Sequence, residues 1–269
     1  MSSPSVRQAI EQGRQVIGTI VQLPSPEIVE IIGRAGFGYV MLDLEHGPYG
    51  PDTARAMVRA ADASGISVLW RVPANRPELI MQALDIGAAG VVVPGVKGAD
   101  DVAAAATSGK FAPEGARGVC SAVRAAGYAA PPDYWARANR ETMIIPLIEN
   151  RAAAEQCDEI VALPGIELIL IGPGDLSHSL NVRGQWDHPI MQATITRVMD
   201  QARKAGKWVG MYAKTPETAR QYLASRVELL LYGIDVQVIY TAFAGVLSSI
   251  RWAIRRVRRW ARLTSRVTE

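Results

Sequence analysis

The sequence predicts an α/β protein in which residues 1–250 form one closed (β/α)8 barrel, the TIM-barrel architecture. Eight short apolar runs rich in β-branched residues occur along the chain, and a helical pattern follows each run. The runs are continuously apolar, which is typical of parallel strands buried on both faces. Eight such units favour a closed barrel over an open doubly wound sheet. The sequence has no Gly-rich dinucleotide-binding loop, so we expect no nucleotide cofactor.

The eight strands are expected at 17–22, 39–43, 67–72, 90–94, 143–148, 167–171, 208–212 and 227–232. The helix after the first strand should begin with Ser25 as its N-cap and Pro26 at its first position, and Gly36 should end it. Its predicted buried stripe consists of Ile28, Ile31, Ile32 and Ala35.

The same unit recurs after the third strand, where Asn75 and Pro77 should begin a helix that ends before Gly87. The connection from Pro94 to Thr142 is much longer than the others and contains several proline and glycine residues. Connections of this length in compact domains are usually lids or interface elements. We therefore expect more than one structural element between the fourth and fifth strands.

The composition of the chain argues against a membrane-spanning protein and against a disulfide-rich one. The chain has 269 residues, of which 49% are hydrophobic, and no apolar run approaches the roughly 20 residues of a membrane span. We therefore expect a soluble, cytoplasmic protein without membrane partners. The two cysteines lie far apart, so neither a disulfide framework nor a thiolate metal site is expected.

The C-terminal segment 251–269 differs in charge from the rest of the chain. It contains seven Arg and one Glu, a net charge of +6, whereas the whole chain has +3, so residues 1–250 carry 3 − 6 = −3. Apolar residues recur at helical spacing through this tail, which predicts a basic amphipathic helix. Such a helix can contact a membrane or nucleic acid, but packing on its own or a neighbouring subunit is favoured.

Polar side chains gather at the predicted C-terminal ends of the strands, where barrel enzymes place their chemistry. These residues are Gln22, Asp43, Glu45, His46, Arg71, Glu149, Asp175 and Asp235. Glu149 and Asp175 end consecutive strands and can share a hard divalent cation such as Mg²⁺ or Mn²⁺. Helix capping or salt bridging by these two acids is an equally weighted alternative.

Three neighbouring features support chemistry at this end. Gly172 to Asp175 form a sharp turn before a helix, which either binds an anion through backbone N–H groups or simply requires glycine. His46 is a candidate general base. Arg71 should meet an oxyanion, or else form an ion pair with Asp43 or Glu45. No predicted strand interior contains a lysine, which disfavours Schiff-base chemistry, although Lys97 and Lys214 follow strands.

The strand-end residues belong to longer motifs: DLEHGP at 43–48, WRVP at 70–73, LDIGAAGVVVP at 84–94, GARGV at 115–119, IEN at 148–150 and IGPGDLSHSL at 171–180. In combination, and over about residues 15–240, these motifs resemble the HpcH/HpaI family of metal-dependent pyruvate aldolases, the class II 4-hydroxy-2-oxo-acid aldolases.

The resemblance implies roles for individual residues. Glu149 and Asp175 would hold a divalent metal (Mg²⁺, Mn²⁺ or Co²⁺), and Arg71 would stabilise developing negative charge. His46 would act as the base, and Asp85 would raise its basicity. Because Asp85 precedes the fourth strand, we expect it near the opposite end of its own barrel. Action within its own subunit and action from a neighbouring subunit are both open at this point. The resemblance also implies a homohexamer, a trimer of dimers that exchange the C-terminal helix.

The implied reaction is reversible cleavage of a 4-hydroxy-2-oxo acid to pyruvate, or a close analogue, and an aldehyde through a metal-stabilised enolate. The backbone at Gly172 and Gly174 would bind the substrate carboxylate, with Asp43 and Glu45 in support. Many relatives have Gln at the position of Leu147, and leucine cannot make the hydrogen bonds of that amide. A 2-oxo-acid donor other than pyruvate is therefore an open alternative. Alternatives are a related metal-enolate lyase or oxaloacetate decarboxylase, and a non-catalytic barrel that acts as a binding protein.

Overall fold

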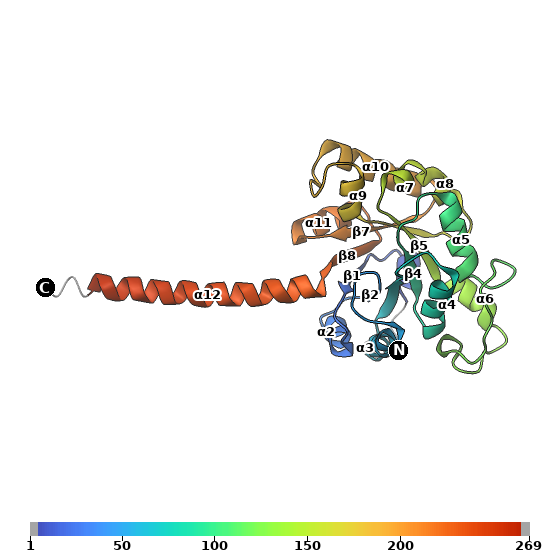
Figure 1. Cartoon of the computed structure of the whole chain (residues 1–269), viewed down its shortest axis with the longest axis horizontal. Helices are drawn as coiled ribbons and strands as arrows, with labels where there is room; N and C mark the ends of the chain where they lie inside the picture. The colour runs from blue at the N-terminus through green and yellow to red at the C-terminus, as the bar shows by residue number, and fades with distance from the viewer. Residues whose placement is uncertain (1–4, 265–269) are drawn as a thin grey trace.

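The computed structural model describes residues 5–264, and the side chains of residues 5–252. Eight parallel strands form a closed barrel in which each strand pairs with its neighbours in chain order (Figure 1). The strands are β1 (Val16–Val21), β2 (Tyr39–Asp43), β3 (Ser67–Arg71), β4 (Gly90–Val93), β5 (Met143–Ile148), β6 (Leu168–Ile171), β7 (Trp208–Ala213) and β8 (Leu229–Ile234). The predicted barrel is confirmed, and the strand ends differ from the expected ones by no more than two residues.

Helices alternate with the strands and surround the barrel in Figure 1. They are α1 (Val6–Glu11), α2 (Pro26–Arg34), α3 (Pro51–Ser64), α4 (Pro77–Ile86), α5 (Ala99–Gly109), the short 3₁₀ helix η1 (Arg124–Ala126), α6 (Tyr134–Glu141), α7 (Arg151–Glu155), α8 (Cys157–Ala162), α9 (Pro173–Ser179), α10 (Pro189–Lys204), α11 (Pro216–Ala224) and α12 (Asp235–Thr264). As expected, the long connection between β4 and β5 contains several elements: α5, η1 and α6.

Apolar side chains form two main layers, one inside the barrel and one between the strands and the helices. Residues that alternate along a strand point to opposite faces. Tyr39 and Met41 of β2 therefore point into the barrel, whereas Val40 and Leu42 pack against helices. Helix α1 packs against the interior layer and donates from Val6 N to Ser67 Oγ at the start of β3. It therefore closes the N-terminal end and leaves the C-terminal end for a site.

The structure corrects the predicted buried face of α2. Ser25 is the N-cap and its side chain accepts from Ile28 N, as expected. Ile31, however, is 62% exposed and Ala35 is also exposed, whereas Val29, which was not predicted to face inward, is fully buried. The apolar residues of this helix span more than one face, so their spacing alone did not identify the side that faces the barrel. The N-cap of α4 is Arg76 rather than Asn75, whose side chain instead donates to Asp101 O.

Helix α12 extends away from the barrel along the long axis of the molecule (Figure 1). It continues without interruption from Asp235 to Thr264, so the predicted helical tail from residue 251 is part of a longer helix. Its exposed apolar side chains within the described range are Val238, Tyr240, Phe243, Val246, Leu247, Ile250 and Trp252. None of the helices in the described part of the chain combines the length and apolar character that crossing a bilayer requires.

Gly18 allows β1 to approach the buried ring of Tyr39. A Cβ atom added at residue 18 would lie 2.4 Å from two ring atoms of Tyr39, whose hydroxyl donates to Leu230 O. Gly18→Ala is therefore expected to lower the free energy of unfolding by about 1–3 kcal/mol, as overpacking of a core does. Chemical denaturation measures this loss.

Gly245→Ala is the matched control, because an added Cβ there meets no atom within 4 Å and alanine favours a helix. Its stability should equal or exceed that of the wild type. Equal stability of the two variants would contradict the close contact between Gly18 and Tyr39.

Candidate active site

A cavity of about 200 Å³ opens at the C-terminal ends of the strands. Its charged and polar lining residues are Gln22, His46, Arg71, Glu149 and Asp175, and its apolar lining includes Met41, Leu147, Leu170 and Leu231. The structure therefore brings five of the predicted strand-end residues into one cavity.

Asp43 and Arg71 form a buried ion pair at this site, with 0% and 8% of their surfaces exposed. The register of β2 and β3 pairs these two residues at the ends of adjacent strands. Arg71 donates from Nε to Asp43 Oδ1 (3.0 Å) and from Nη2 to Oδ2 (2.7 Å). The alternative prediction for Arg71, an ion pair, is therefore what the structure shows, and Arg71 also lines the cavity.

The Asp43 carboxylate organises the loop after β2 as well. It accepts from Gln22 Nε2 (2.9 Å) and from the backbone N–H groups of Glu45 and His46. Burial raises the pKa of Asp43, but the hydrogen bonds and charge of Arg71 outweigh it, so the pKa lies below its usual value. Asp43 is therefore an ionised anchor that fixes both Arg71 and the His46 loop.

Glu45 and His46 lie at the mouth of the cavity. Glu45 Oε2 is 3.2 Å from Arg71 Nη1 and 3.8 Å from His46 Nε2. Burial raises the pKa of Glu45, while the Arg71 and His46 charges oppose the shift. The His46 side chain is 57% exposed and lines the cavity, so its imidazole is accessible to a bound molecule.

Glu149 lies directly after β5 and Asp175 in the first turn of α9, and both line the cavity. Glu149 Oε1 accepts from Gly95 N (2.7 Å). Burial raises the pKa of Glu149 to about 7; this hydrogen bond lowers it, and the charges of Glu45 and Asp175 raise it. In the described part of the chain, neither Glu149 nor Asp175 forms a salt bridge, and the Asp175 side chain does not cap α9.

The donor set at Glu149 and Asp175 fits a hard divalent cation. Two carboxylates repel each other in this partly desolvated site, and a cation between them would relieve that repulsion. Among the described residues there is no group of three or more His, Cys, Asp and Glu side chains arranged to hold a metal. Protein oxygens from Glu149 and Asp175 would therefore leave positions for water and substrate.

The turn at Gly172 brings β6 and α9 close to Glu149. Gly172 N donates to Ile148 O, and an added Cβ at residue 172 would lie 3.1 Å from Glu149 Cβ and 3.3 Å from Leu147 Cδ1. A side chain at this position would crowd the carboxylate. At Gly174 an added Cβ would meet no atom within 4 Å, so space does not require glycine there.

Asp85 lies away from this cavity, as expected. It is in the last turn of α4, towards the N-terminal end of the barrel, and its Oδ1 is 2.5 Å from Arg117 Nη2. It does not line the cavity that contains His46. Any contact between an Asp85 and a His46 would therefore involve two copies of the chain.

Three lining or neighbouring residues have roles that the sequence did not indicate. Trp186 and Tyr212 line the cavity and pack edge to face, with ring centroids 5.9 Å apart. Strand alternation could have identified Tyr212 as inward-facing, but Trp186 lies in a loop with no such signal. Asp235, also at a strand end, accepts from Gln22 N and Leu23 N, so it anchors the loop after β1.

Comparisons with known proteins identify the family of this chain. The family model for HpcH/HpaI aldolase/citrate lyase matches residues 17–242. The 5-keto-4-deoxy-D-glucarate aldolase of Salmonella gallinarum is 35% identical over 234 residues, which cover 87% of this chain and 91% of that protein.

Solved structures share the fold. The HpcH/HpaI aldolase from Desulfitobacterium hafniense has a TM-score of 0.86 and 29% identity, covering 92% of this chain and 96% of that one. CitE from Mycobacterium tuberculosis, determined with magnesium and acetate, has a TM-score of 0.57 and 16% identity, covering 83% and 87%. The chain therefore belongs to the HpcH/HpaI aldolase/citrate lyase family and is a carbon–carbon lyase.

Proposed function

We propose that the chain is a divalent-metal-dependent aldolase. It reversibly cleaves a 4-hydroxy-2-oxo acid to pyruvate, or a close 2-oxo-acid analogue, and an aldehyde. The observation that carries this proposal is that one cavity contains the Glu149 and Asp175 carboxylates, the Arg71 guanidinium and the His46 imidazole. The relative that acts on 5-keto-4-deoxy-D-glucarate supports the same substrate class.

Glu149 and Asp175 would hold the metal, with Mg²⁺, Mn²⁺ or Co²⁺ as candidates. When bound, a divalent cation supplies Lewis-acid stabilisation of the negative charge that develops on an enolate oxygen. Magnesium in the distant CitE structure belongs to that protein; for this chain, the proposal depends on the carboxylate pair.

The remaining chemistry belongs to the chain's own groups. His46, directly or through a water, would take the proton of the substrate C4 hydroxyl, which its exposed position at the mouth permits. Arg71 would hold the oxygen that becomes negative, and Asp43 keeps its guanidinium in place. The sequence also suggested the backbone at Gly172 for the substrate carboxylate, but its N–H donates to Ile148 O, so the Gly174 N–H in the first turn of α9 would bind that carboxylate.

The apolar residues at the base of the cavity affect which 2-oxo acid the enzyme can use as its donor substrate. Leu147 and Leu170 are 4% and 2% exposed and form an apolar surface beside the carboxylates. Leu147 offers no hydrogen bond to an oxo acid, but it can pack against the hydrocarbon part of the donor. Substrates that release 2-oxobutanoate therefore belong in the same panel as those that release pyruvate.

We also propose that the active enzyme is a homohexamer, a trimer of dimers. Its dimers would exchange the C-terminal helix, and Asp85 would act on a neighbouring His46. The exposed apolar side chains of α12 and the distance of Asp85 from its own cavity support this arrangement. Small-molecule substrates, and neither nucleic acid nor membrane, are the proposed partners.

His46→Asn tests the proposed base. The variant should lower kcat by roughly 10²- to 10⁴-fold, the usual contribution of general acid–base catalysis, because asparagine cannot take the proton. The measurement is release of 2-oxo acid from a panel of 4-hydroxy-2-oxo acids, with chelator-treated protein and with each metal restored.

His178→Asn is the control, since His178 is exposed on α9 and does not line the cavity. It should retain wild-type kcat. Release that continues without metal would overturn the metal mechanism, and full activity of His46→Asn would overturn the role of the imidazole.

A further inference from the structure

The cavity of the candidate active site has a charged side and an apolar side. Its charged groups come from the ends of β2, β3 and β5 and from α9; they are His46, Arg71, Glu149 and Asp175. Strands β7, β8 and β1, which are neighbours in the closed barrel, line it only with apolar or aromatic side chains. We refer to these side chains, together with one from the loop before α10, as the apolar arc: Ile20, Trp186, Tyr212, Leu231 and Ile234.

Strand register makes the apolar arc a continuous wall. Tyr212 of β7 is the register partner of Leu231 of β8, and Ile20 of β1 is the register partner of Ile234 of β8. Paired residues on neighbouring parallel strands point to the same face of a sheet. The four side chains therefore lie next to one another on the inner wall of the barrel, at its C-terminal end.

Trp186 extends this wall beyond the strands. Its ring packs edge to face against Tyr212, and Gln192 Nε2 donates to Trp186 O (2.8 Å), which fixes the backbone of the loop. Both aromatic side chains are half-buried, so each still has surface that a ligand can cover. Their polar groups, the Tyr212 hydroxyl and the Trp186 indole N–H, are neutral. The apolar arc therefore contains no charged group.

The roles proposed for the charged side leave the apolar arc to one part of the substrate. Glu149, Asp175 and the Gly174 N–H would bind the 2-oxo-acid end, whereas His46 and Arg71 would face the C4 hydroxyl. The substituent on C4, which leaves as part of the aldehyde, then has the apolar arc as its remaining wall.

Within the described part of the chain, no unpaired cation lines the cavity. Arg71 is the only lysine or arginine among the lining residues, and Asp43 and Glu45 already hold its guanidinium. Lys97 and Lys214 follow β4 and β7 but do not line the cavity. A second carboxylate on the substrate would therefore lose part of its hydration here without gaining a cationic partner.

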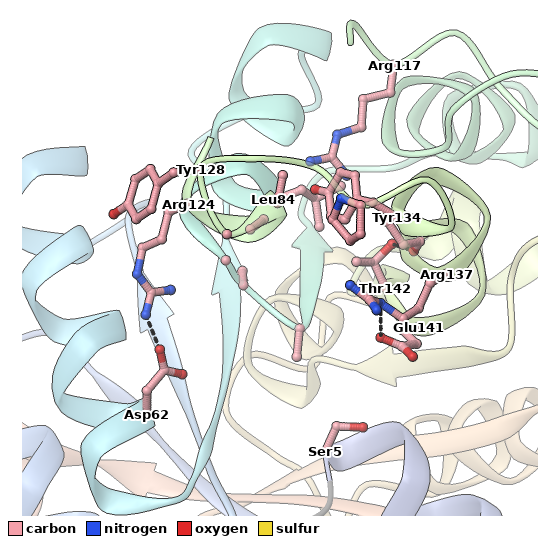
Figure 2. A pocket seen from close by; sticks show the side chains of 18 of the residues that line it. Ser5, Asp62, Leu84, Arg117, Arg124, Tyr128, Tyr134, Arg137, Glu141 and Thr142 are labelled. Atoms are coloured by element: carbon pink, nitrogen blue, oxygen red, sulfur yellow. Dashed lines mark hydrogen bonds and ion pairs between the residues drawn. The ribbon is translucent and has the colours of Figure 1, made fainter. Parts of the chain in front are cut away.

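The arginine-rich pocket of this chain lies at the other end of the barrel. Figure 2 shows it: Arg124 pairs with Asp62, and Thr142 marks the position just before β5, at the N-terminal end of the strands. Arg117, also in this view, pairs with Asp85. In the proposed hexamer, the Asp85 that reaches a neighbouring His46 therefore brings no unpaired cation with it.

We infer that the aldehyde part of the substrate is uncharged and apolar, and that the apolar arc binds it. The inference rests on the proposed aldolase function and narrows its substrate class. A branched aliphatic or aromatic group on C4 is stabilised against the arc, since the free energy of burial grows with the apolar area removed from water. The preferred substrates are 4-hydroxy-2-oxo monocarboxylates with an apolar substituent on C4.

The test compares two substrates of matched shape, 4-hydroxy-7-methyl-2-oxooctanoate and 4-hydroxy-2-oxoheptanedioate. Both release pyruvate, and an isopropyl group in the first takes the place of the terminal carboxylate in the second. The pair is repeated with a 3-methyl group, so that 2-oxobutanoate is released. With Mn²⁺ present, we expect the wild type to cleave the isopropyl compound with a kcat/KM at least about tenfold higher.

The outcomes separate this inference from the proposed function. Equal kcat/KM values, or a preference for the dicarboxylate, would overturn the inference and leave the aldolase function in place. Release of a 2-oxo acid from none of the four compounds would overturn both.

Trp186→Arg tests the apolar arc itself. The guanidinium would give the terminal carboxylate a partner at the edge of the cavity and would remove apolar surface. The ratio of the two kcat/KM values should shift at least about tenfold towards the dicarboxylate. Because both values are measured on one preparation, a fraction of unfolded protein does not change their ratio.

Gln185→Arg is the matched control, because Gln185 is exposed in the same loop and does not line the cavity. It adds an arginine one residue away and should keep the wild-type ratio. An equal shift in both variants would indicate a general effect of charge, and an unchanged ratio in Trp186→Arg would show that Trp186 does not contact the substituent. Either result would overturn the binding of the aldehyde part by the apolar arc.

Discussion

Glu149→Gln is expected to lower kcat/KM on the order of 1,000-fold, about 4 kcal/mol of transition-state stabilisation, while the fold remains intact. The amide keeps the shape of the side chain and can still accept from Gly95 N, but it removes one of the two carboxylates that would hold the cation. Binding of Mn²⁺, measured by calorimetry, should weaken in parallel with the loss of 2-oxo-acid release.

Glu159→Gln provides the comparison, because Glu159 is an exposed acid on α8, outside the cavity. This variant should retain wild-type activity and metal affinity. If Glu149→Gln bound Mn²⁺ as tightly as the wild type, the metal would lie elsewhere and the proposed mechanism would be wrong.

Asp43→Ala is expected to lower the free energy of unfolding by about 3–5 kcal/mol, because it leaves Arg71 as a buried cation without its main partner. It also removes the acceptor for Gln22 Nε2 and for the N–H groups of Glu45 and His46. The Tm should fall by roughly 10 °C, since each kcal/mol shifts the Tm of a domain of about this size by roughly 2–4 °C. Urea denaturation and a thermal melt measure the two quantities.

This loss should depend on pH in a defined direction. The pKa of Asp43 is lowered in the folded protein, so its contribution to stability is present above the usual carboxyl pKa and is lost as the pH falls through the folded value. The difference between Asp43→Ala and the wild type should therefore be largest near neutral pH and shrink in acid.

Asp52→Ala is the matched control, since Asp52 pairs with Arg55 in an exposed contact on α3. Exposed pairs of this kind contribute little, about 0–1 kcal/mol. Losses of similar size in the two variants would contradict the buried Asp43–Arg71 pair as a main support of the site.

Much of the fold follows from the sequence because its signals are local. Continuous apolar runs identify strands buried on both faces, and the order of strands and helices favours a parallel barrel. Once the barrel is predicted, residues at strand ends must converge on one rim. This is why Arg71, Glu149 and Asp175 could be placed in one site before the structure was known.

For residues outside the strands, local sequence patterns do not predict which side chains face the barrel or the cavity. The apolar residues of α2 allow two helix faces, and the barrel contact places Val29 inward and Ile31 outward. Trp186 reaches the cavity from a loop without periodicity. In these cases, packing between distant segments selects one arrangement from several that local propensity permits.

The sequence by itself therefore determined the barrel, its active rim and the residue types available there, because these depend on periodicity and chain order. Only the tertiary structure decided how charges are partnered. Strand register joins Asp43 to Arg71, whereas the packing of the long β4–β5 connection against α4 joins Asp85 to Arg117. Partnering of charges depends on distances between atoms that lie far apart in the chain, and no local pattern encodes those distances.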